Sequence, residues 1–459
     1  MSQIGQNVRL GGLEAVRRVL ERAGAAGAHS ADSLLVESDT IEARVRDEEI
    51  DFVKQARECA LGIRAFVRGV DGLRSAITST SDLSPEALDR LADDTVSLAR
   101  ATAQDPCAGL PEDGFATDWP DLELLDPADR EVPVEARIAQ ARTAEAAARA
   151  VDPRISNSEG SDVASEFHQI SYANTAGFEG EYASAAHSLV SAPVASQNGA
   201  MQTDYWVSAA RSLSALESPQ SVGRRAAERA LGLLGARQVA TCEVPVVFDA
   251  TVSRSLVGNL ISCLNGYSIY RKSSFLSNRL GTSIASPQVT LVDDGHLSAG
   301  LGTKPFDGEG LATGRKTLVE RGRLERWLLD CYSGRKLAMG STGNAARSVG
   351  SAPSVSPTNL WLEPGDTSEE ELVADTPRGL YVQGLFGHGF NPVTGDFSRG
   401  ARGWWIEGGK LVHPVEEVTV AGNLGDMLQR IDGVASELHW FGRVAAPALR
   451  VARMTVAGG

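Results

Sequence analysis

One glycine-rich segment of the chain gathers several side-chain types that could bind a peptide terminus or an acidic group. Residues 387–400 read GHGFNPVTGDFSRG. Glycine permits close approach of the backbone, and arginine can hold a carboxylate through two parallel hydrogen bonds. The same composition is typical of a rigid, turn-rich connection whose polar side chains satisfy its own backbone. Both interpretations stay open, and the candidate residues for substrate or partner binding are His388, Asn391, Thr394, Asp396, Ser398 and Arg399.

Zinc hydrolysis on a helix needs two histidines about one turn apart, with an acid nearby. No two of the seven histidines lie within five residues of one another, and the pattern HExxH does not occur. The spacing therefore favours scattered structural or surface histidines, and the sequence assigns no metal ligand to this chain.

Nucleophilic chemistry has equally little support. Ser333 and Lys336 match S-x-x-K, but the companion patterns S-D-N and K-T-G are absent. Cys331 precedes an expected helix, which could stabilise a thiolate, yet a buried thiol is the favoured interpretation. Asp307 and Glu309 could bind a cation in a glycine-rich loop, where a solvated turn is the simpler expectation. We assign no catalytic residue.

The composition excludes several classes of function. The 459 residues include 59 acidic and 44 basic ones, for a net charge of −15, and no basic run that could grip phosphates or an anionic membrane. No apolar stretch approaches the roughly 18 residues of a membrane span. The five cysteines form no CxxC pair, which predicts reduced thiols in the cytoplasm. Residues 1–6 lack the features of a signal peptide.

The first half of the chain must supply long strands flanked by helices. Apolar spacing predicts a helix ending near Gly27, and period-two alternation predicts three or four strands joined by hairpins over 33–77. Ser84-Pro85 starts a second helix with Leu88, Leu91 and Leu98 as its buried face. A loop over 105–131, a helix over 133–150, a strand meander over 155–214 and a helix from Ser218 to about Gly235 follow.

The second half is expected to be mostly β. An apolar strand over 244–248 precedes a helix capped by Asp249, and hairpins turn at 320–323 and 408–409. Ser368 begins a short helix with a capping box. The sequence thus predicts a mixed α/β (α+β) fold of two domains: an N-terminal α/β domain over 1–238 and a β-rich C-terminal domain over 239–459.

Several motifs together carry a resemblance to a known family. They are PFDGEG (305–310), YSGRKL (332–337), STGNA (341–345), PTNL (357–360), GHG (387–389), NPVTGDFSRG (391–400), VTVAGNL (418–424) and MTVAG (454–458). In this order they resemble the TldE (PmbA) side of the TldD/TldE family. TSDLS (80–84) and the strands before it are similar too, so that the resemblance covers essentially the whole chain.

The resemblance implies an architecture and an activity. In this family a TldD chain and a TldE chain pair into a heterodimer that encloses a peptide-degrading chamber. The TldD chain carries zinc on an HExxxH helix, with a cysteine near its C-terminus as a further ligand. The pair trims unfolded peptides, including leader peptides of modified-peptide antibiotics, and similar pairs serve bacterial antibiotic pathways.

Carried over position by position, the resemblance removes catalysis from this chain. Val257 and Gly258 stand where the family's first histidine and glutamate would be, and Ser262 stands at the second histidine. Residues 440–443 contain no cysteine. The resemblance therefore implies a non-catalytic subunit without a cofactor of its own, with zinc on a TldD-like partner and a peptide as substrate.

Two other interpretations remain. The chain could be a homodimeric peptide-binding scaffold or regulator with no enzymatic role. It could also be a stand-alone hydrolase that uses His388, Asp396 and Arg399.

Overall fold

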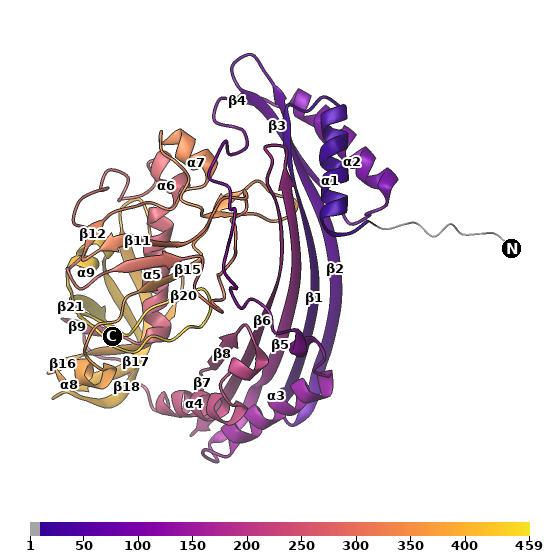
Figure 1. Cartoon of the computed structure of the whole chain (residues 1–459). Coiled ribbons are helices and arrows are strands. Elements are labelled where there is room, and N and C mark those ends of the chain that lie inside the picture. The colour runs from indigo at the N-terminus through magenta and orange to yellow at the C-terminus, as the bar shows by residue number, and fades with distance from the viewer. Residues whose placement is uncertain (1–9) are drawn as a thin grey trace.

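The computed structural model describes residues 10–459, which form two halves facing each other. A large curved sheet runs along one side of the molecule, and the β-rich C-terminal half lies against its concave face (Figure 1). The expected absence of a signal peptide concerns residues that lie outside the described range. The mixed α+β class predicted from the sequence is confirmed.

From residue 10 onward, the N-terminal half consists of one eight-stranded sheet with four α-helices. The sheet order is β4-β3-β2-β1-β5-β6-β7, and β8 also pairs with β6. Its strands are β1 (Ser30–Arg46), β2 (Glu49–Arg68), β3 (Leu73–Thr80), β4 (Gln104–Asp105), β5 (Ile155–Asn174), β6 (Glu179–Gln197), β7 (Ala200–Thr203) and β8 (Trp206–Ala210). Its helices are α1 (Gly12–Ala25), α2 (Pro85–Ala101), α3 (Val134–Arg149) and α4 (Pro219–Gly232), with short 3₁₀ turns at Pro127–Arg130 and Leu213–Ala215.

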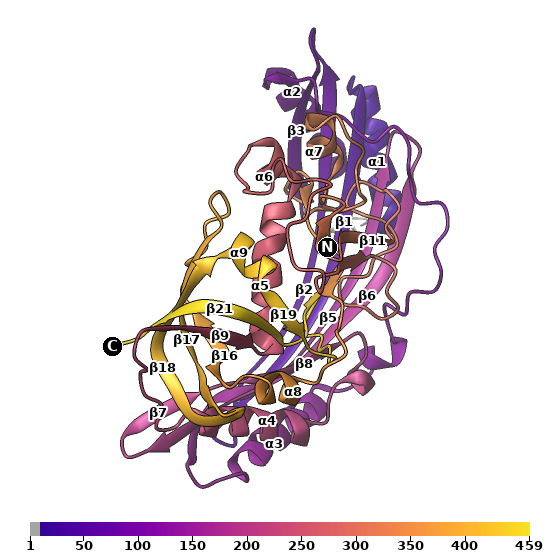
Figure 2. The ribbon, with the colours of Figure 1, turned by 90° about the vertical axis from the view of Figure 1, so that its left-hand side faces the viewer.

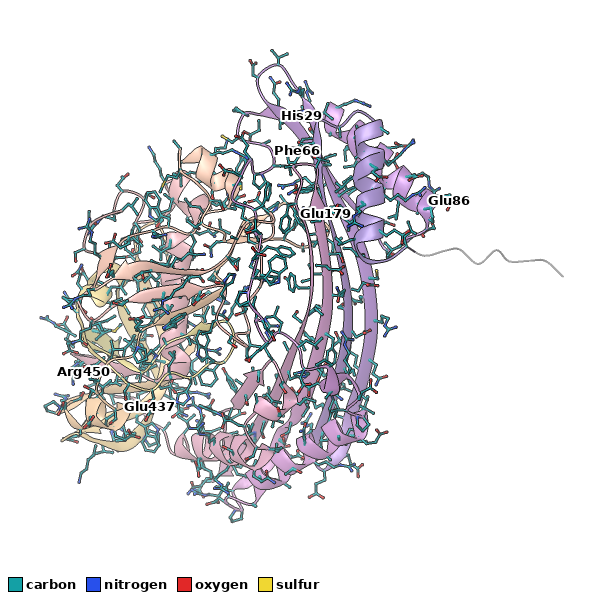
Figure 3. The ribbon with its side chains drawn as sticks, in the orientation of Figure 1. His29, Phe66, Glu86, Glu179, Glu437 and Arg450 are labelled. Carbon is teal, nitrogen blue, oxygen red and sulfur yellow. The ribbon has the colours of Figure 1, made fainter. Side chains whose placement is uncertain are left out.

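Alternation along β1 separates the two faces of the long sheet. Leu35 packs with α1 and α2, whereas its neighbour Leu34 packs on the other side with Phe306 of the C-terminal half. Because successive side chains of a strand point to opposite faces, one strand builds both contacts. The α1–α2 pair covers the outer face at one end, and Glu179 of β6 lies beside α1 (Figure 3), where it pairs with Arg17. The α3–α4 pair sits at the opposite end (Figure 1).

The C-terminal half contains two larger sheets around α5. One has the order β12-β11-β10-β15-β20, and the other runs β18-β17-β16-β9-β21-β19 and closes on itself because β18 also pairs with β21. The strands are β9 (Cys242–Phe248), β10 (Leu291–Asp294), β11 (Arg315–Glu320), β12 (Arg323–Leu324), β13 (Ala345–Ala346), β14 (Ser354–Val355), β15 (Asn359–Leu362), β16 (Arg378–Phe386), β17 (Asp396–Glu407), β18 (Lys410–Asn423), β19 (Ile431–Val434), β20 (Val444–Ala445) and β21 (Leu449–Ala457). The helices are α5 (Ala250–Leu264), α6 (Gly266–Tyr270), α7 (Cys331–Lys336), α8 (Glu369–Ala374) and α9 (Leu424–Gln429).

Most expected elements are present, with two corrections. Leu98 is 49% exposed, so it is not part of the buried face of α2, which continues instead through Val96 and Ala99. The sequence predicts a second hairpin strand from Leu324 to Leu329 after the turn at 320–323, but β12 covers only Arg323–Leu324. The amides of Glu325 and Arg326 both donate to the carbonyl of Leu318, which ends the ladder. The domain boundary at 238/239 falls between α4 and β9 and stays a prediction.

Buried charges hold the two halves together. Asp32 of β1 pairs with Arg64 of β2 and, at 2.6 Å, with Arg347 of the C-terminal half. Burial alone would raise the pKa of Asp32, but the two arginines outweigh it and lower that pKa. Glu309 lies 3.8 Å from Arg64 and accepts the amide of Cys331 at 2.8 Å. This network fixes the C-terminal half on the sheet.

Candidate functional site

Helix α5 stands at the centre of the candidate site, between the strands of the C-terminal half (Figure 2). The side chain of Asp249 accepts the amide of Val252 at 2.9 Å and caps the helix, as the sequence predicts. Leu256 and Leu260 face the main apolar core. The helix is therefore anchored by its cap and by one apolar face. Its other face is free to line the candidate site.

Three positions of α5 correspond to the His, Glu and His of the family's zinc motif. The residues that stand there in this chain do not fit a metal ion. Val257 is 6% exposed and packs in the core. Gly258 has open space where a side chain would stand, and the hydroxyl of exposed Ser262 donates to the carbonyl of Asn259 at 2.6 Å. A hydrocarbon, a hydrogen atom and a neutral hydroxyl are not the imidazole, thiolate or carboxylate ligands that zinc prefers. Across residues 10–459, no group of three or more His, Cys, Asp or Glu is arranged to hold a metal.

A cavity of about 560 Å³ lies along the open face of α5. Thr251, Arg254, Ser255 and Gly258 of this helix line one side of it. The other sides come from α4, the end of β16, β17 and the segment before β20. The cavity thus forms where α4 of the N-terminal half meets the closed sheet of the C-terminal half, two elements that adjoin in Figures 1 and 2.

The charges that line this cavity are strongly unbalanced. Five arginines face a single carboxylate, that of Asp204. Asp204 is already saturated, because it accepts Gln383 Nε2 at 2.7 Å and pairs with Arg229 at 3.1 Å and Arg402 at 3.3 Å. Arg229 also pairs with Asp249 at 2.9 Å. Burial lowers the pKa of Arg229, but the two aspartates outweigh this effect and raise it.

Arg254 and Arg399 have no carboxylate partner within residues 10–459. Arg254 Nε donates to the carbonyl of Thr251 at 3.2 Å, and its guanidinium lies over the ring of Phe441. Arg399 makes one long hydrogen bond, 3.4 Å to the carbonyl of Leu385, and its buried Nε has no partner. Burial lowers the pKa of Arg399, with no carboxylate to offset the effect. Two guanidinium groups therefore face the cavity with unused donors.

The glycine-rich segment 387–400 divides into a turn and a strand. Residues 387–395 connect β16 to β17, and residues 396–400 belong to β17. Asn391 Oδ1 accepts the amide of Val393 at 2.9 Å, and Thr394 Oγ1 donates to Asp396 Oδ2 at 2.7 Å. Asn423 Nδ2 donates to the carbonyl of Thr394 at 2.8 Å. These contacts are those of a rigid turn that satisfies its own polar groups.

The structure separates the six residues that the sequence places together. Asn391, Thr394 and Asp396 support the turn, and Arg399 alone of the six lines the cavity. His388 and Ser398 are exposed, and neither side chain forms a hydrogen bond with the described residues. No hydrogen bond or ion pair within the described range joins His388, Asp396 and Arg399, so this geometry does not form the constellation of a stand-alone hydrolase.

The other candidate motifs have structural roles. Cys331 is a buried thiol whose pKa is raised by burial and by Glu309. Ser333 donates to Asp330 at 2.6 Å, whereas Lys336 bonds Asp105 at 3.2 Å, so they form no Ser–Lys pair. The five cysteines are free thiols.

The expectation of a solvated turn at 306–310 is wrong. Asp307 and Glu309 are 2% and 1% exposed. Asp307 accepts the amides of Glu309, Leu311 and Ala345, at 2.8 to 3.0 Å. The contact with the N-terminal half buries this loop, which composition alone does not reveal.

The main cavity residues were missed from the sequence. Arg229, Arg254 and Arg402 come from α4, α5 and β17 and share no local pattern. Arg399 and Arg402 are three residues apart on one strand, which would normally point them to opposite faces. Register shifts at Val382/Gly384 and Ala401/Gly403 allow both to line the same cavity. Only the glycine-rich segment 387–400, through its single arginine Arg399, pointed to this site.

Comparison with known proteins gives consistent matches along the chain. Three family models match: PmbA/TldA metallopeptidase domain 1 over residues 31–99, the central domain over 127–234 and the C-terminal domain over 241–458. The metalloprotease PmbA of Escherichia coli O157:H7 is 36% identical over 97% of this chain and 98% of its own length. A PmbA homolog of Haemophilus influenzae is 34% identical, over 97% and 96%.

Solved structures share the fold. A putative modulator of DNA gyrase from Bacteroides thetaiotaomicron aligns with a TM-score of 0.90 at 28% identity, over 97% of this chain and 99% of that one. TldE from Thermococcus kodakarensis aligns with a TM-score of 0.88 at 21% identity, over 97% and 100%. No helix within residues 10–459 combines the length and apolar character needed to cross a membrane.

Proposed function

Because the chain belongs to the PmbA/TldD metallopeptidase family, on its PmbA (TldE) side, we propose that it is the non-catalytic subunit of a heterodimeric peptidase. The partner is a TldD-like chain that carries the zinc ion. The substrate is an unfolded or modified peptide, as in natural-product pathways, and the complex works in the cytoplasm.

The observation that carries this proposal is the residue set on α5. The helix is well formed, capped and packed, yet Val257, Gly258 and Ser262 occupy the three positions of the resembled zinc motif. A chain with this helix offers neither a zinc ligand nor a general base there. Hydrolysis at this helix would then depend on chemistry that a second chain supplies.

This chain would contribute half of the chamber and hold the substrate. An extended peptide can add to a sheet edge through backbone hydrogen bonds, a mode that reads the backbone more than the side chains. His388 and Ser398, exposed beside the rigid turn, and the turn residues Asn391, Thr394 and Asp396 provide a preformed surface for the peptide or the partner. Arg399 contributes from the cavity.

A reconstitution assay tests this proposal. This chain, the TldD-like chain of the same genome and their mixture are each incubated with an unfolded peptide, and cleavage is followed by mass spectrometry. We expect robust cleavage only in the mixture. Cleavage by this chain alone, in a preparation free of the partner, would contradict the proposal.

His388→Ala separates the subunit role from a stand-alone hydrolase. If His388 binds substrate or partner, the mixture keeps its kcat and shows a higher KM or weaker pairing. A loss of kcat would instead place His388 in the chemistry. A stable homodimer that ignores every TldD-like chain would favour the scaffold alternative.

A further inference from the structure

We propose that the arginine-lined cavity beside α5 binds the free carboxylate of a peptide. The proposal rests on the peptidase-subunit function proposed above, because that function makes a peptide the molecule to be held. It adds a chemical requirement, a terminal carboxylate, and a place in the fold where that group is recognised.

Charge is the first argument. The lining holds five arginines and one aspartate, and Asp204 is occupied by Arg229, Arg402 and Gln383. Counting Asp249, which pairs with Arg229 behind the lining, the site keeps three positive charges more than negative ones. In a chain whose net charge is −15, such a local excess of positive charge marks a place suited to an anion.

Unused donors are the second argument. Arg254 and Arg399 lack any carboxylate partner among residues 10–459, and the buried Nε atoms of Arg399 and Arg402 have no hydrogen-bond acceptor. The terminal nitrogens are the available donors: Arg254 donates from one of them to the carbonyl of Phe441 at 3.5 Å and Arg399 to that of Leu385 at 3.4 Å, and an incoming oxygen acceptor could replace these long contacts with shorter ones. The planar guanidinium fork matches the two oxygens of a carboxylate better than a lysine would.

Size and access are the third argument. A cavity of about 560 Å³ falls within the range of about 300–1,000 Å³ that is typical of ligand sites. Tyr205 and Phe386, which are 44% and 51% exposed, belong to its lining, so solvent and a peptide end can reach it. Leu385 and Val252 add apolar surface for the side chain of the peptide's last residue.

Access to the cavity also depends on the missing side chain at Gly258 of α5. Gly258 lines the cavity, and a Cβ atom there would meet nothing within 4 Å. Gly258 stands where the family's zinc motif has its glutamate, so this chain has open space beside the arginines at that position. The same helix face that would carry a carboxylate base in the resembled motif is here left open to an incoming carboxylate.

The test compares two peptides that differ in one group. An acetylated octapeptide of Ala, Gly and Leu is prepared with a free C-terminal carboxylate and as its C-terminal amide, and each is titrated into the full chain by calorimetry. A charge-assisted hydrogen bond is worth enough to give about a tenfold preference for the acid in a partly exposed site. We expect the acid to bind about tenfold tighter than the amide.

Arginine variants show which side chains cause the preference for the free acid over the amide. Arg399→Gln and Arg254→Gln should each reduce the acid-to-amide ratio about fivefold, while Arg399→Lys, which keeps the charge but not the fork, should retain part of it. The matched control is Arg90→Gln, an exposed arginine on α2 at the far end of the sheet, which should leave the ratio unchanged. Thermal melting of each variant shows that it is folded.

Several results would overturn the proposal. Equal binding of acid and amide, no measurable binding of either, or a preference that survives in both Gln variants would each do so. If inorganic phosphate binds with the same arginine dependence while acid and amide remain equivalent, the cavity is a phosphate site, and the peptide-carboxylate proposal is wrong. Binding is measured without hydrolysis or a partner chain, so these failures are distinct from a failure of the subunit proposal.

Discussion

Glu309 is the residue whose protonation should be most visible in the stability of the protein. It is 1% exposed and lies between the two halves, 3.8 Å from Arg64. Burial raises its pKa from an ordinary value of 4.5 to about 7; Arg64 partly offsets this shift, and Asp307 adds to it. Because the folded-state pKa is the higher one, the folded protein binds the proton more tightly than the unfolded chain does.

The sign of the pH dependence follows from this difference. At low pH both states carry the proton, and Glu309 costs nothing. As the pH rises from about 4.5 through about 7, the unfolded chain loses its proton more readily, and folding becomes less favourable. A shift of this size corresponds to a loss of about 2.5 kcal/mol between pH 5 and pH 8, at about 1.36 kcal/mol per pKa unit.

Glu309→Gln should remove this loss. Glutamine keeps the volume and an oxygen that can accept the amide of Cys331, which the carboxylate accepts at 2.8 Å. Urea unfolding of wild type and variant at pH 5, 6, 7 and 8 gives the difference in unfolding free energy. We expect that difference to move in favour of the variant by about 2.5 kcal/mol across this range. Other titrating groups are common to both proteins and cancel; a difference that is flat with pH would refute the reasoning.

Three further substitutions test packing and charge by urea unfolding. Gly310→Ala places a Cβ atom 2.5 Å from the Phe178 ring, whereas the Cβ atom of the control Gly177→Ala meets nothing within 4 Å. Both glycines have positive φ, so the backbone strain is similar in the two variants. Gly310→Ala should therefore cost about 1–3 kcal/mol more of unfolding free energy, through overpacking. Equal losses would contradict this. Asp249→Ala removes the cap of α5 and one partner of partly buried Arg229, and should cost about 3 kcal/mol or more. The cap variant Ser368→Ala, at a half-buried residue with no ion pair, should cost only about 1 kcal/mol, and similar values for the two would show that the Asp249 pair is unimportant. Phe306→Ala empties a cluster that contains Phe178, Tyr172 and Tyr182, with an expected loss of about 3–5 kcal/mol; a loss near that of the exposed control Phe386→Ala would count against a buried cluster there.

Local signals were enough to predict most of the elements. The Ser368 capping box starts α8 with both of its hydrogen bonds, and Asp249 caps α5 as expected. Alternation over 33–77 predicts β1, β2 and β3, which are antiparallel. These features depend on residues a few positions apart, so the sequence shows them directly. Leu98 fails because it lies off the buried stripe of α2, which runs through Leu88, Ala92 and Val96 to Ala99 at intervals of three or four residues.

Contacts between the halves could not be predicted in the same way. Asp307 and Glu309 sit in a loop with the composition of a solvated turn. Contacts distant in sequence bury them, with Ala345 beside Asp307 and Arg64 of β2 beside Glu309. The cavity arginines come from α4, α5, β17 and the segment before β20, and a register shift turns Arg402 to the same side as Arg399. The glycine-rich segment did identify Arg399, but its neighbours Thr394 and Asp396 satisfy each other.

Native mass spectrometry of this chain, co-expressed with the TldD-like chain of its own genome, tests the central claim most directly. It reads the stoichiometry and the bound metal together. The subunit function predicts a one-to-one heterodimer with zinc on the partner alone, since Val257, Gly258 and Ser262 offer no ligand. A metal-free homodimer that leaves the partner unbound, or zinc retained by this chain alone, would contradict it.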